Sequence, residues 1–243
     1  MKPVATRNNG LEVTPDNSRR LFLRKSMMAV TATGIAGTGI VTACREGSGE
    51  EVTPAEDLMR EHGVLNRIML VYDTCIVKLR NQQQFDPGAL HEGVQMIRTF
   101  IEDYHEQLEE KFVFPVFTNA NKLVDLVQLL YIQHHAGKEI TTQTLELLNA
   151  GAFQQPETAD KLASLLETFN RMYRPHEARE DTVLFPALRR LLSANAYFAM
   201  GEDFEKKEHE LFGADGFESI VDKVASIEKK LGIYDMTITT PGV

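Results

Sequence analysis

The stretch HEQLEEKFVFP at residues 105–115 occurs a second time in the chain as HEAREDTVLFP at residues 176–186. The two copies share His, two Glu, Phe and Pro at equal offsets. In each copy the His and the second shared Glu are four residues apart, so on a helix both side chains lie on one face about one turn apart. Each copy can therefore direct an imidazole and a carboxylate to one point.

A further histidine precedes each copy, His62 before the first and His134 before the second, at nearly the same separation. The chain thus reads as two versions of one helical hairpin, each supplying a His and then an HxxxE motif. An internal repeat of this kind organises a whole domain.

The apolar residues recur every three or four positions from residue 55 onward, which predicts helices. We expect helices at about 54–80, 89–114, 120–149 and 157–185, the second and fourth ending near Pro115 and Pro186. Long helices joined by short loops predict an all-α, up-down four-helix bundle over residues 55–190. Residues 191–243 are expected to form a C-terminal helical extension.

Six potential metal ligands fall on the inward apolar stripes of these helices. A buried carboxylate without a partner is costly, and no buried Lys or Arg is expected to balance these groups. Imidazole and carboxylate together suit iron, zinc or manganese, and two metals fit, each taking about two His while both Glu are able to bridge. A structural zinc bundle stays open as an alternative. The predicted ligands are His62, His105, Glu109, His134, His176 and Glu180.

The repeated pattern, with Phe-Pro after each HxxxE, resembles the hemerythrin-like (HHE cation-binding) family. The resemblance implies two iron ions in a non-haem di-iron centre that reacts with or binds dioxygen, nitric oxide or peroxide. A non-enzymatic oxygen or nitric-oxide sensor, or an iron-handling or storage protein, is the alternative. Oxygen-carrying relatives have another His where this chain has Lys138, which weakens the oxygen-carrier reading.

Several neighbouring residues leave alternatives open. His135 and Glu139 also form an i,i+4 pair, although His134 lies on the apolar stripe. His209 could supply a fifth imidazole from the C-terminal extension. Asp181 stands at the offset used in oxygen-carrying relatives, but a regular helix favours Glu180.

Two tyrosines are candidates for supporting roles near the metals. Tyr131 and Tyr173 each precede a predicted histidine ligand by three residues, so each could lie one turn away as a hydrogen-bond donor or occasional ligand. A core-lining role is the alternative for both.

Charge and cysteine content exclude other kinds of site. The formal net charge is −9, so binding of nucleic acid is not expected. Cys44 and Cys75 are the only cysteines, which excludes a cysteine zinc knuckle and a disulfide framework.

Residues 1–44 are typical of a twin-arginine export signal. Arg19 and Arg20 precede a weakly hydrophobic stretch, and the sequence VTAC at 41–44 resembles a lipoprotein cleavage box that would lipidate Cys44. Residues 45–54 read as a flexible tether. We therefore expect an exported protein, periplasmic or anchored as an outward-facing lipoprotein, that contacts a membrane only through its signal or lipid. A transmembrane anchor or a cytoplasmic tail is the alternative.

Overall fold

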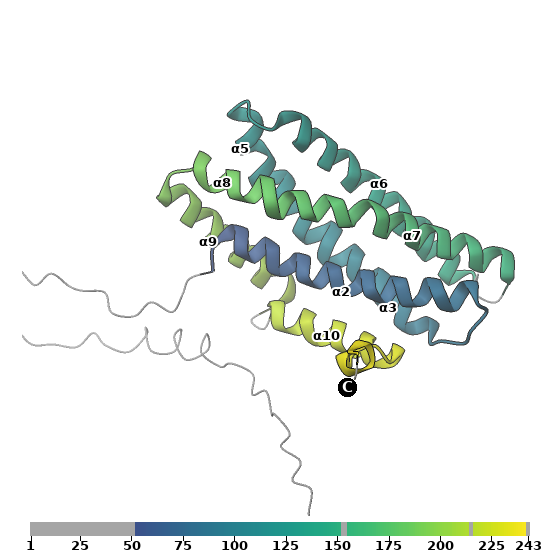
Figure 1. Ribbon diagram of the computed structural model, residues 1–243. Helices are drawn as coiled ribbons and strands as arrows, with labels where there is room; N and C mark the ends of the chain where they lie inside the picture. Colours follow the sequence, from purple (N-terminus) through teal and green to yellow (C-terminus); the bar gives the residue numbers. More distant parts are fainter. Residues whose placement is uncertain (1–51, 152–154, 214–215, 242–243) are drawn as a thin grey trace, which may run out of the picture. The chain divides into compact units, whose positions relative to one another are not determined.

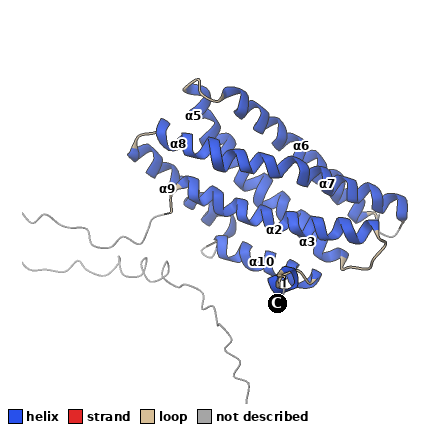
Figure 2. Ribbon diagram, in the orientation of Figure 1, coloured by secondary structure: helices blue, strands red, loops and turns tan. Residues whose placement is uncertain are grey.

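The computed structural model describes residues 52–151, 155–213 and 216–241. The predicted signal segment, including Cys44, lies outside these ranges. Within them every regular element is a helix, so the predicted all-α class is confirmed (Figure 2). No helix in the described part of the chain is both long and apolar enough to traverse a bilayer.

Nine α-helical segments are interleaved with three π-helical segments and one short 3-10 helix in the described residues. The α-helical segments are α2 (Pro54–Arg80), α3 (Pro87–Met96), α4 (Glu106–Leu108), α5 (Phe114–Asn119), α6 (Val124–Asn149), α7 (Pro156–Arg179), α8 (Phe185–Leu191), α9 (Ala194–Phe212) and α10 (Gly216–Leu231). The π-helical segments are η1 (Ile97–His105), η2 (Glu109–Val113) and η4 (Glu180–Leu184), and the 3-10 helix is η5 (Met236–Thr239).

Helix α2 has the predicted bounds because its first turn is capped by its own sequence. The Thr53 side chain accepts a hydrogen bond from the Glu56 backbone, and the Glu56 carboxylate accepts one from the Thr53 backbone. Pro54 occupies the first helical position, where a missing N–H costs nothing. This capped first turn fixes the residue at which α2, the helix that carries His62, begins.

The long segments pack side by side as a helical bundle (Figure 1). Helix α2 packs against α7, α7 packs against α6, and η1 contacts both α2 and α6. Their facing side chains form one continuous apolar core. The second expected helix is a succession of segments from α3 to α5 and not one regular α-helix, and the up-down order stays a prediction.

The expected helix ends at Pro115 and Pro186 are wrong. A π-helical segment precedes each proline, and a new α-helix begins one residue before it, α5 at Phe114 and α8 at Phe185. A proline in the first turn of a new segment loses no hydrogen bond, so the chain continues in helical form. The two π-helical segments η2 and η4 begin at Glu109 and Glu180, the last residue of each HxxxE motif.

The C-terminal helices α9 and α10 pack on α2 and α3. Arg67 on α2 makes a bidentate ion pair with the buried Glu228 on α10, at 2.9 and 2.6 Å. Phe212 at the end of α9 meets the Tyr104 ring edge-on at 5.2 Å. The extension therefore covers the flank of the bundle next to the helices that carry His62 and His105.

Candidate metal centre

The six predicted ligands come together inside the bundle, and each is at most 4% exposed. His62 comes from α2, His134 from α6 and His176 from α7. His105 ends η1, and each glutamate begins a π-helical segment. A π-helical turn is frequent at functional sites. Here the irregular backbone begins at the two carboxylates that face the centre.

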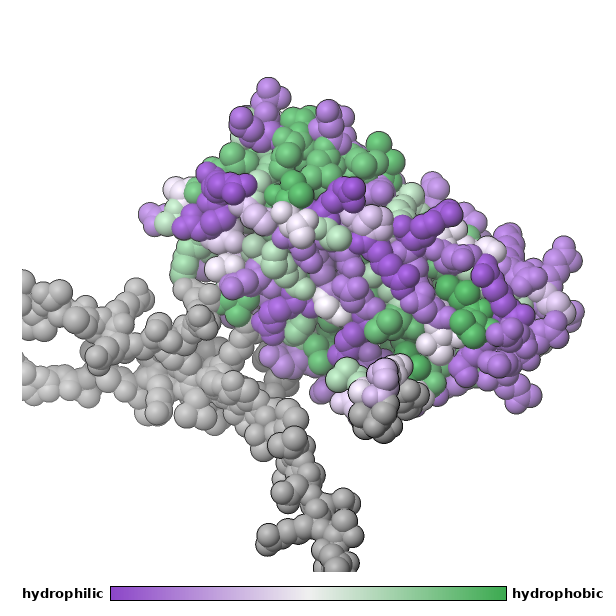
Figure 3. Space-filling model, in the orientation of Figure 1, coloured by the Kyte–Doolittle hydropathy of each residue, from purple (hydrophilic) through white to green (hydrophobic). Residues whose placement is uncertain are grey.

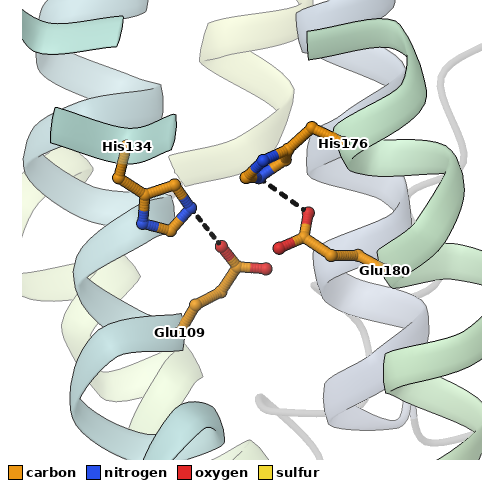
Figure 4. A group of neighbouring side chains, drawn as sticks. All are labelled: Glu109, His134, His176 and Glu180. Atoms are coloured by element: carbon orange, nitrogen blue, oxygen red, sulfur yellow. Dashed lines mark ion pairs between the residues drawn. The ribbon is translucent and has the colours of Figure 1, made fainter. Parts of the chain in front are cut away.

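The potential ligand atoms form two overlapping groups. Glu109, His134, His176 and Glu180 offer atoms within 4.8 Å of one another, and so do His62, His105 and Glu109 (Figure 4 shows the first group). Glu109 belongs to both groups. Glu180 Oε2 lies 3.4 Å from His62 Nε2 and 3.2 Å from His176 Nε2, so it too stands between the groups. Each carboxylate is placed between two histidines.

The residues fit a pair of metal ions. Both carboxylate oxygens of Glu109 and of Glu180, and His134 Nε2, are buried without a hydrogen-bond partner among the described residues. Such atoms are costly to bury unless something else satisfies them. His62 Nε2 and His105 Nε2 are 3.1 Å apart. One metal ion could bind both atoms at that separation, because a zinc–imidazole bond is about 2.0–2.1 Å long.

Every histidine of the group is held from its outer side through Nδ1. Carboxylates hold three of them: His62 by Asp181 at 2.8 Å, His105 by Glu61 at 2.6 Å and His134 by Glu110 at 3.0 Å. Gln133 Oε1 holds His176 at 2.9 Å. In a metal-bound form with these carboxylates ionised, they and the Gln133 oxygen can only accept hydrogen bonds, so Nδ1 would carry the proton and Nε2 would present its lone pair to the centre.

These outer partners follow the repeat. The sequence analysis missed Glu61, Glu110 and Gln133, and it considered Asp181 only as an alternative ligand. Glu61 and Gln133 each precede the first histidine of a repeat, and Glu110 and Asp181 each follow the second glutamate of a motif. The signal was present, because all four are adjacent in sequence to predicted ligands. The structure also places Asp181 outside the cluster, 35% exposed, as the partner of His62.

The phenylalanines of the two Phe-Pro pairs are also part of the centre. Phe114 stacks on His134 with ring centroids 5.4 Å apart, and Phe185 stacks on His62 at 5.6 Å. Each phenylalanine therefore covers the histidine contributed by the other repeat. This accounts for the Phe at equal offset in both copies and keeps water from the imidazole faces.

Burial and the contacts between these groups shift their pKa values in different directions. Burial raises the pKa of Glu109 well above its usual range, and the nearby Glu180 carboxylate adds to the effect. Burial also disfavours ionised Glu180, but contact with His176 and His62 holds its pKa well below normal. Burial lowers the pKa of His134 to about 4. Burial likewise lowers the pKa of His105, so His105 and His134 are neutral, the form that binds metal. Burial also disfavours charged His62, but hydrogen bonds to Asp181 and Glu180 raise its pKa to about 10, so a metal ion would have to displace a proton there.

Lys138 stands one turn beyond His134 and points its ammonium to carboxylates. Its Nζ lies 3.2 Å from Glu106 Oε2 and 3.4 Å from Glu110 Oε1. The Tyr173 hydroxyl donates to Glu106 Oε1 at 2.7 Å, and the Tyr173 ring centroid is 5.3 Å from that of His176. The lysine thus joins a polar network behind the ligands and supplies no imidazole.

Tyr131 takes neither of the two roles considered for it, a hydrogen-bond donor near the metals or a core-lining aromatic. Its side chain is 44% exposed, and its ring packs against His135, which is also exposed. The buried stripe of α6 passes through Leu130, four positions before His134, and leaves Tyr131 beside it on the exposed side of the helix. His209 is likewise exposed.

Tyr131 lines a surface cavity of about 450 Å³ between α5 and α6. Glu110 and Phe114, the two residues that contact His134 from the outer side, line the same cavity. Apolar side chains gather on the surface over this end of the bundle (Figure 3). The cavity therefore reaches the side chains that support one histidine of the centre.

A family model described as the hemerythrin HHE cation binding domain matches residues 53–188. Uncharacterized proteins of Mycobacterium tuberculosis and Mycobacterium bovis are each 52% identical over 191 residues, covering 78% of this chain and 74% of theirs. No solved structure matches the chain.

Proposed function

The chain belongs to the hemerythrin HHE cation-binding domain family, and from this premise we propose that the buried cluster holds two iron ions as a non-haem di-iron centre that reacts with or binds dioxygen, nitric oxide or peroxide. One observation carries the proposal: Glu109 belongs to both groups of ligand atoms, and its buried oxygens have no other partner among the described residues. A shared carboxylate of this kind suits a pair of metals and not a single one.

The residues of this chain prepare the site for such a pair. When metal is bound, Glu109 and Glu180 would supply two negative charges between the histidines, so the ligand set would offset part of the metal charge. The outer carboxylates fix the ring orientation and raise the basicity of the imidazoles. When bound, the two irons would supply Lewis acidity and the capacity to exchange electrons with a small ligand.

The aromatic side chains around the histidines bear on how water is kept out and how a small ligand could enter. Phe114 and Phe185 cover two of the histidines, while the cavity beside Glu110 offers a small molecule an approach to the same region. Lys138 leaves the ligand set one imidazole short of oxygen-carrying relatives. A coordination position would then be open to an exogenous ligand, which favours reactivity or sensing over reversible transport of oxygen.

The proposal is tested on full-length protein purified from its native host by metal analysis and optical spectroscopy. We expect about two irons per chain and the absorption bands of a bridged di-iron centre. Stoichiometric zinc without iron would contradict it. Stopped-flow mixing with oxygen, nitric oxide and peroxide then separates turnover from reversible binding, which would indicate the sensor or storage alternative.

We also propose that the protein is exported in folded form through its N-terminal segment and held by a lipid on Cys44. This rests on the sequence alone. Replacing both Arg19 and Arg20 with Lys should retain the protein in the cytoplasmic fraction, and Cys44→Ser should release it from membranes. Unchanged fractionation of both variants would contradict the proposal.

A further inference from the structure

Taking the proposed di-iron function as the premise, we propose that Lys138 is a positioning residue of the centre: its ammonium weakens the hold of Glu110 on the His134 imidazole and so raises the reduction potential of the metal that His134 binds. The three side chains meet at one atom. Glu110 Oε1 lies 3.0 Å from His134 Nδ1 and 3.4 Å from Lys138 Nζ. The lysine therefore acts on the outer nitrogen of a predicted ligand through a carboxylate.

The Lys138 ammonium is held in a defined place by a second carboxylate. Its Nζ lies 3.2 Å from Glu106 Oε2, and the Tyr173 hydroxyl donates to the other oxygen of Glu106 at 2.7 Å. Burial disfavours the charged form of Lys138, but the charges of Glu106 and Glu110 raise its pKa, so the side chain keeps its proton. The lysine side chain is 25% exposed and that of Glu106 only 1%, so water screens this charge incompletely.

A positive charge beside Glu110 opposes the effect of this carboxylate on His134. A carboxylate that accepts the Nδ1 proton makes the imidazole a stronger electron donor to a metal, which stabilises the more highly charged state of the metal. The Lys138 ammonium competes for the same oxygen, so Glu110 accepts a weaker hydrogen bond from His134. Its charge also disfavours ferric iron more than ferrous iron, which carries one positive charge less. Both effects raise the reduction potential.

The other outer partners lack such a cation within the described parts of the chain. Neither the Asp181 nor the Glu61 carboxylate makes an ion pair with a Lys or Arg there, and Gln133 is a neutral amide. The charge of Lys138 therefore acts mainly at His134. Removing it should change one metal of the pair more than the other.

Lys138 also joins helices, so a structural role has to be separated from an electronic one. Glu106 begins α4, Lys138 lies on α6 and Tyr173 lies on α7, and the contacts between them link the three segments. A purely structural lysine would change the stability of the bundle and leave the hydrogen bond of His134 as it is. A measurement at His134 and a variant that restores the charge distinguish the two roles.

The first test uses the full chain with isotope-labelled histidine, loaded with zinc as a diamagnetic metal, and records the Nδ1 proton resonances by NMR. We expect Lys138→Met, which keeps the apolar stem, to move the His134 resonance downfield, because a stronger hydrogen bond deshields the proton. The His62 resonance, whose partner is Asp181, should not move and is the internal reference. Lys138→Arg keeps the charge and should leave the His134 resonance near its original position.

The second test is a redox titration of the iron-loaded full chain, followed through its absorption bands. Lys138→Met should shift the equilibrium about tenfold towards ferric iron at a given potential, which corresponds to ~59 mV for a one-electron step. Lys138→Arg should behave like the unmodified chain. Lys161→Met, at an exposed position on α7, is the matched control and should also leave the potential unchanged. Denaturant unfolding of each metal-free variant records any loss of stability separately.

The proposal is wrong if Lys138→Met leaves the His134 resonance, or the potential of the iron-loaded chain, as it is in Lys161→Met. Equal shifts in Lys138→Met and Lys138→Arg would also overturn it, because they would come from geometry and not from charge. Should Lys138→Met not fold, Lys138→Gln is measured in its place, since it keeps a hydrogen-bond donor and removes the charge. A chain that takes up no iron would refute the di-iron function, and the NMR measurement would still decide whether Lys138 acts on His134.

Discussion

His62 Nδ1 lies 2.8 Å from Asp181 Oδ1, so a side chain of the second repeat orients a histidine of the first. The reverse relationship holds between Glu110 and His134 at 3.0 Å. In the same way, Phe114 and Phe185 each stack on a histidine of the other repeat. The two hairpins are therefore joined through the outer partners of the metal ligands, and the packing of the bundle and the geometry of the centre depend on the same contacts.

Replacing Asp181 with Ala should weaken metal binding without removing a ligand. His62 would lose the partner that fixes its tautomer and ring orientation, and loss of such a partner typically costs 10–100-fold in affinity. Competition with a chelator of known affinity measures the effect. Asp160→Ala, at an exposed position on α7, is the control and should change nothing. Equal affinity in Asp181→Ala and the original chain would show that the contact does not orient the ligand.

Glu109→Ala should abolish the binding of at least one metal per chain, because Glu109 is shared by both groups of ligand atoms. Metal analysis of the purified variant checks this. Glu139→Ala serves as the comparison: Glu139 is exposed on α6 and forms the alternative i,i+4 pair with His135. We expect full metal content there. Metal retained in Glu109→Ala, or lost in Glu139→Ala, would mean that the ligands are assigned to the wrong face.

The metal-free protein should become less stable as the pH rises from 7 to 9. Burial raises the pKa of Glu61 and of Glu106 to about 8, so the folded chain holds protons there that the unfolded chain has already lost. Burial works against ionised His62, but hydrogen bonds to Asp181 and Glu180 raise its pKa to about 10, which acts in the same direction. Each group contributes a slope of up to ~1.4 kcal/mol per pH unit in the free energy of unfolding.

Denaturant unfolding at pH 7, 8 and 9 in the presence of a chelator measures this slope. The stability conferred by these groups is fully present below their unfolded pKa values and is lost as the pH rises through the folded ones. Metal-loaded protein should not show the same decline, because metal binding favours deprotonated ligands. A metal-free protein whose stability is constant or increases over this range would show that these groups are not buried with their protons.

The sequence predicted the elements whose signals are local and periodic. Helix α2 has the expected bounds, and His134 faces inward, as its stripe with Val127 and Leu130 predicts. Helix α6 begins at Val124 and not at 120, because Asn121 and Leu123 adopt left-handed backbone conformations. The regular spacing of apolar residues alone does not reveal such a turn.

The π-helical segments and the outer partners could not be read from a regular 3.6-residue period. A π-helical turn changes which residues share a face, so it is invisible to a pattern that assumes constant spacing. Contacts such as Glu61 to His105 join residues 44 apart in the chain. They depend on how the helices pack, which a single helix pattern does not contain.

Gly137→Ala should destabilise the bundle, against the usual benefit of alanine in a helix. A Cβ atom at Gly137 would overlap the Tyr173 hydroxyl and lie 2.8 Å from Tyr173 Cζ, and both belong to a rigid, fully buried ring. Overpacking of this kind costs about 1–3 kcal/mol in the free energy of unfolding. Denaturant unfolding of the metal-free variant measures it.

Gly63→Ala on α2 is the control for this substitution, because a Cβ atom there meets nothing within 4 Å. It should raise the free energy of unfolding by about 0.5–1 kcal/mol through helix propensity alone. Adding Tyr173→Phe to Gly137→Ala removes the overlapping oxygen but leaves the ring carbons, so it should recover only part of the loss. If Gly137→Ala were as stable as Gly63→Ala, Tyr173 would have moved, and its hydrogen bond to Glu106 would not be what fixes the ring beside His176.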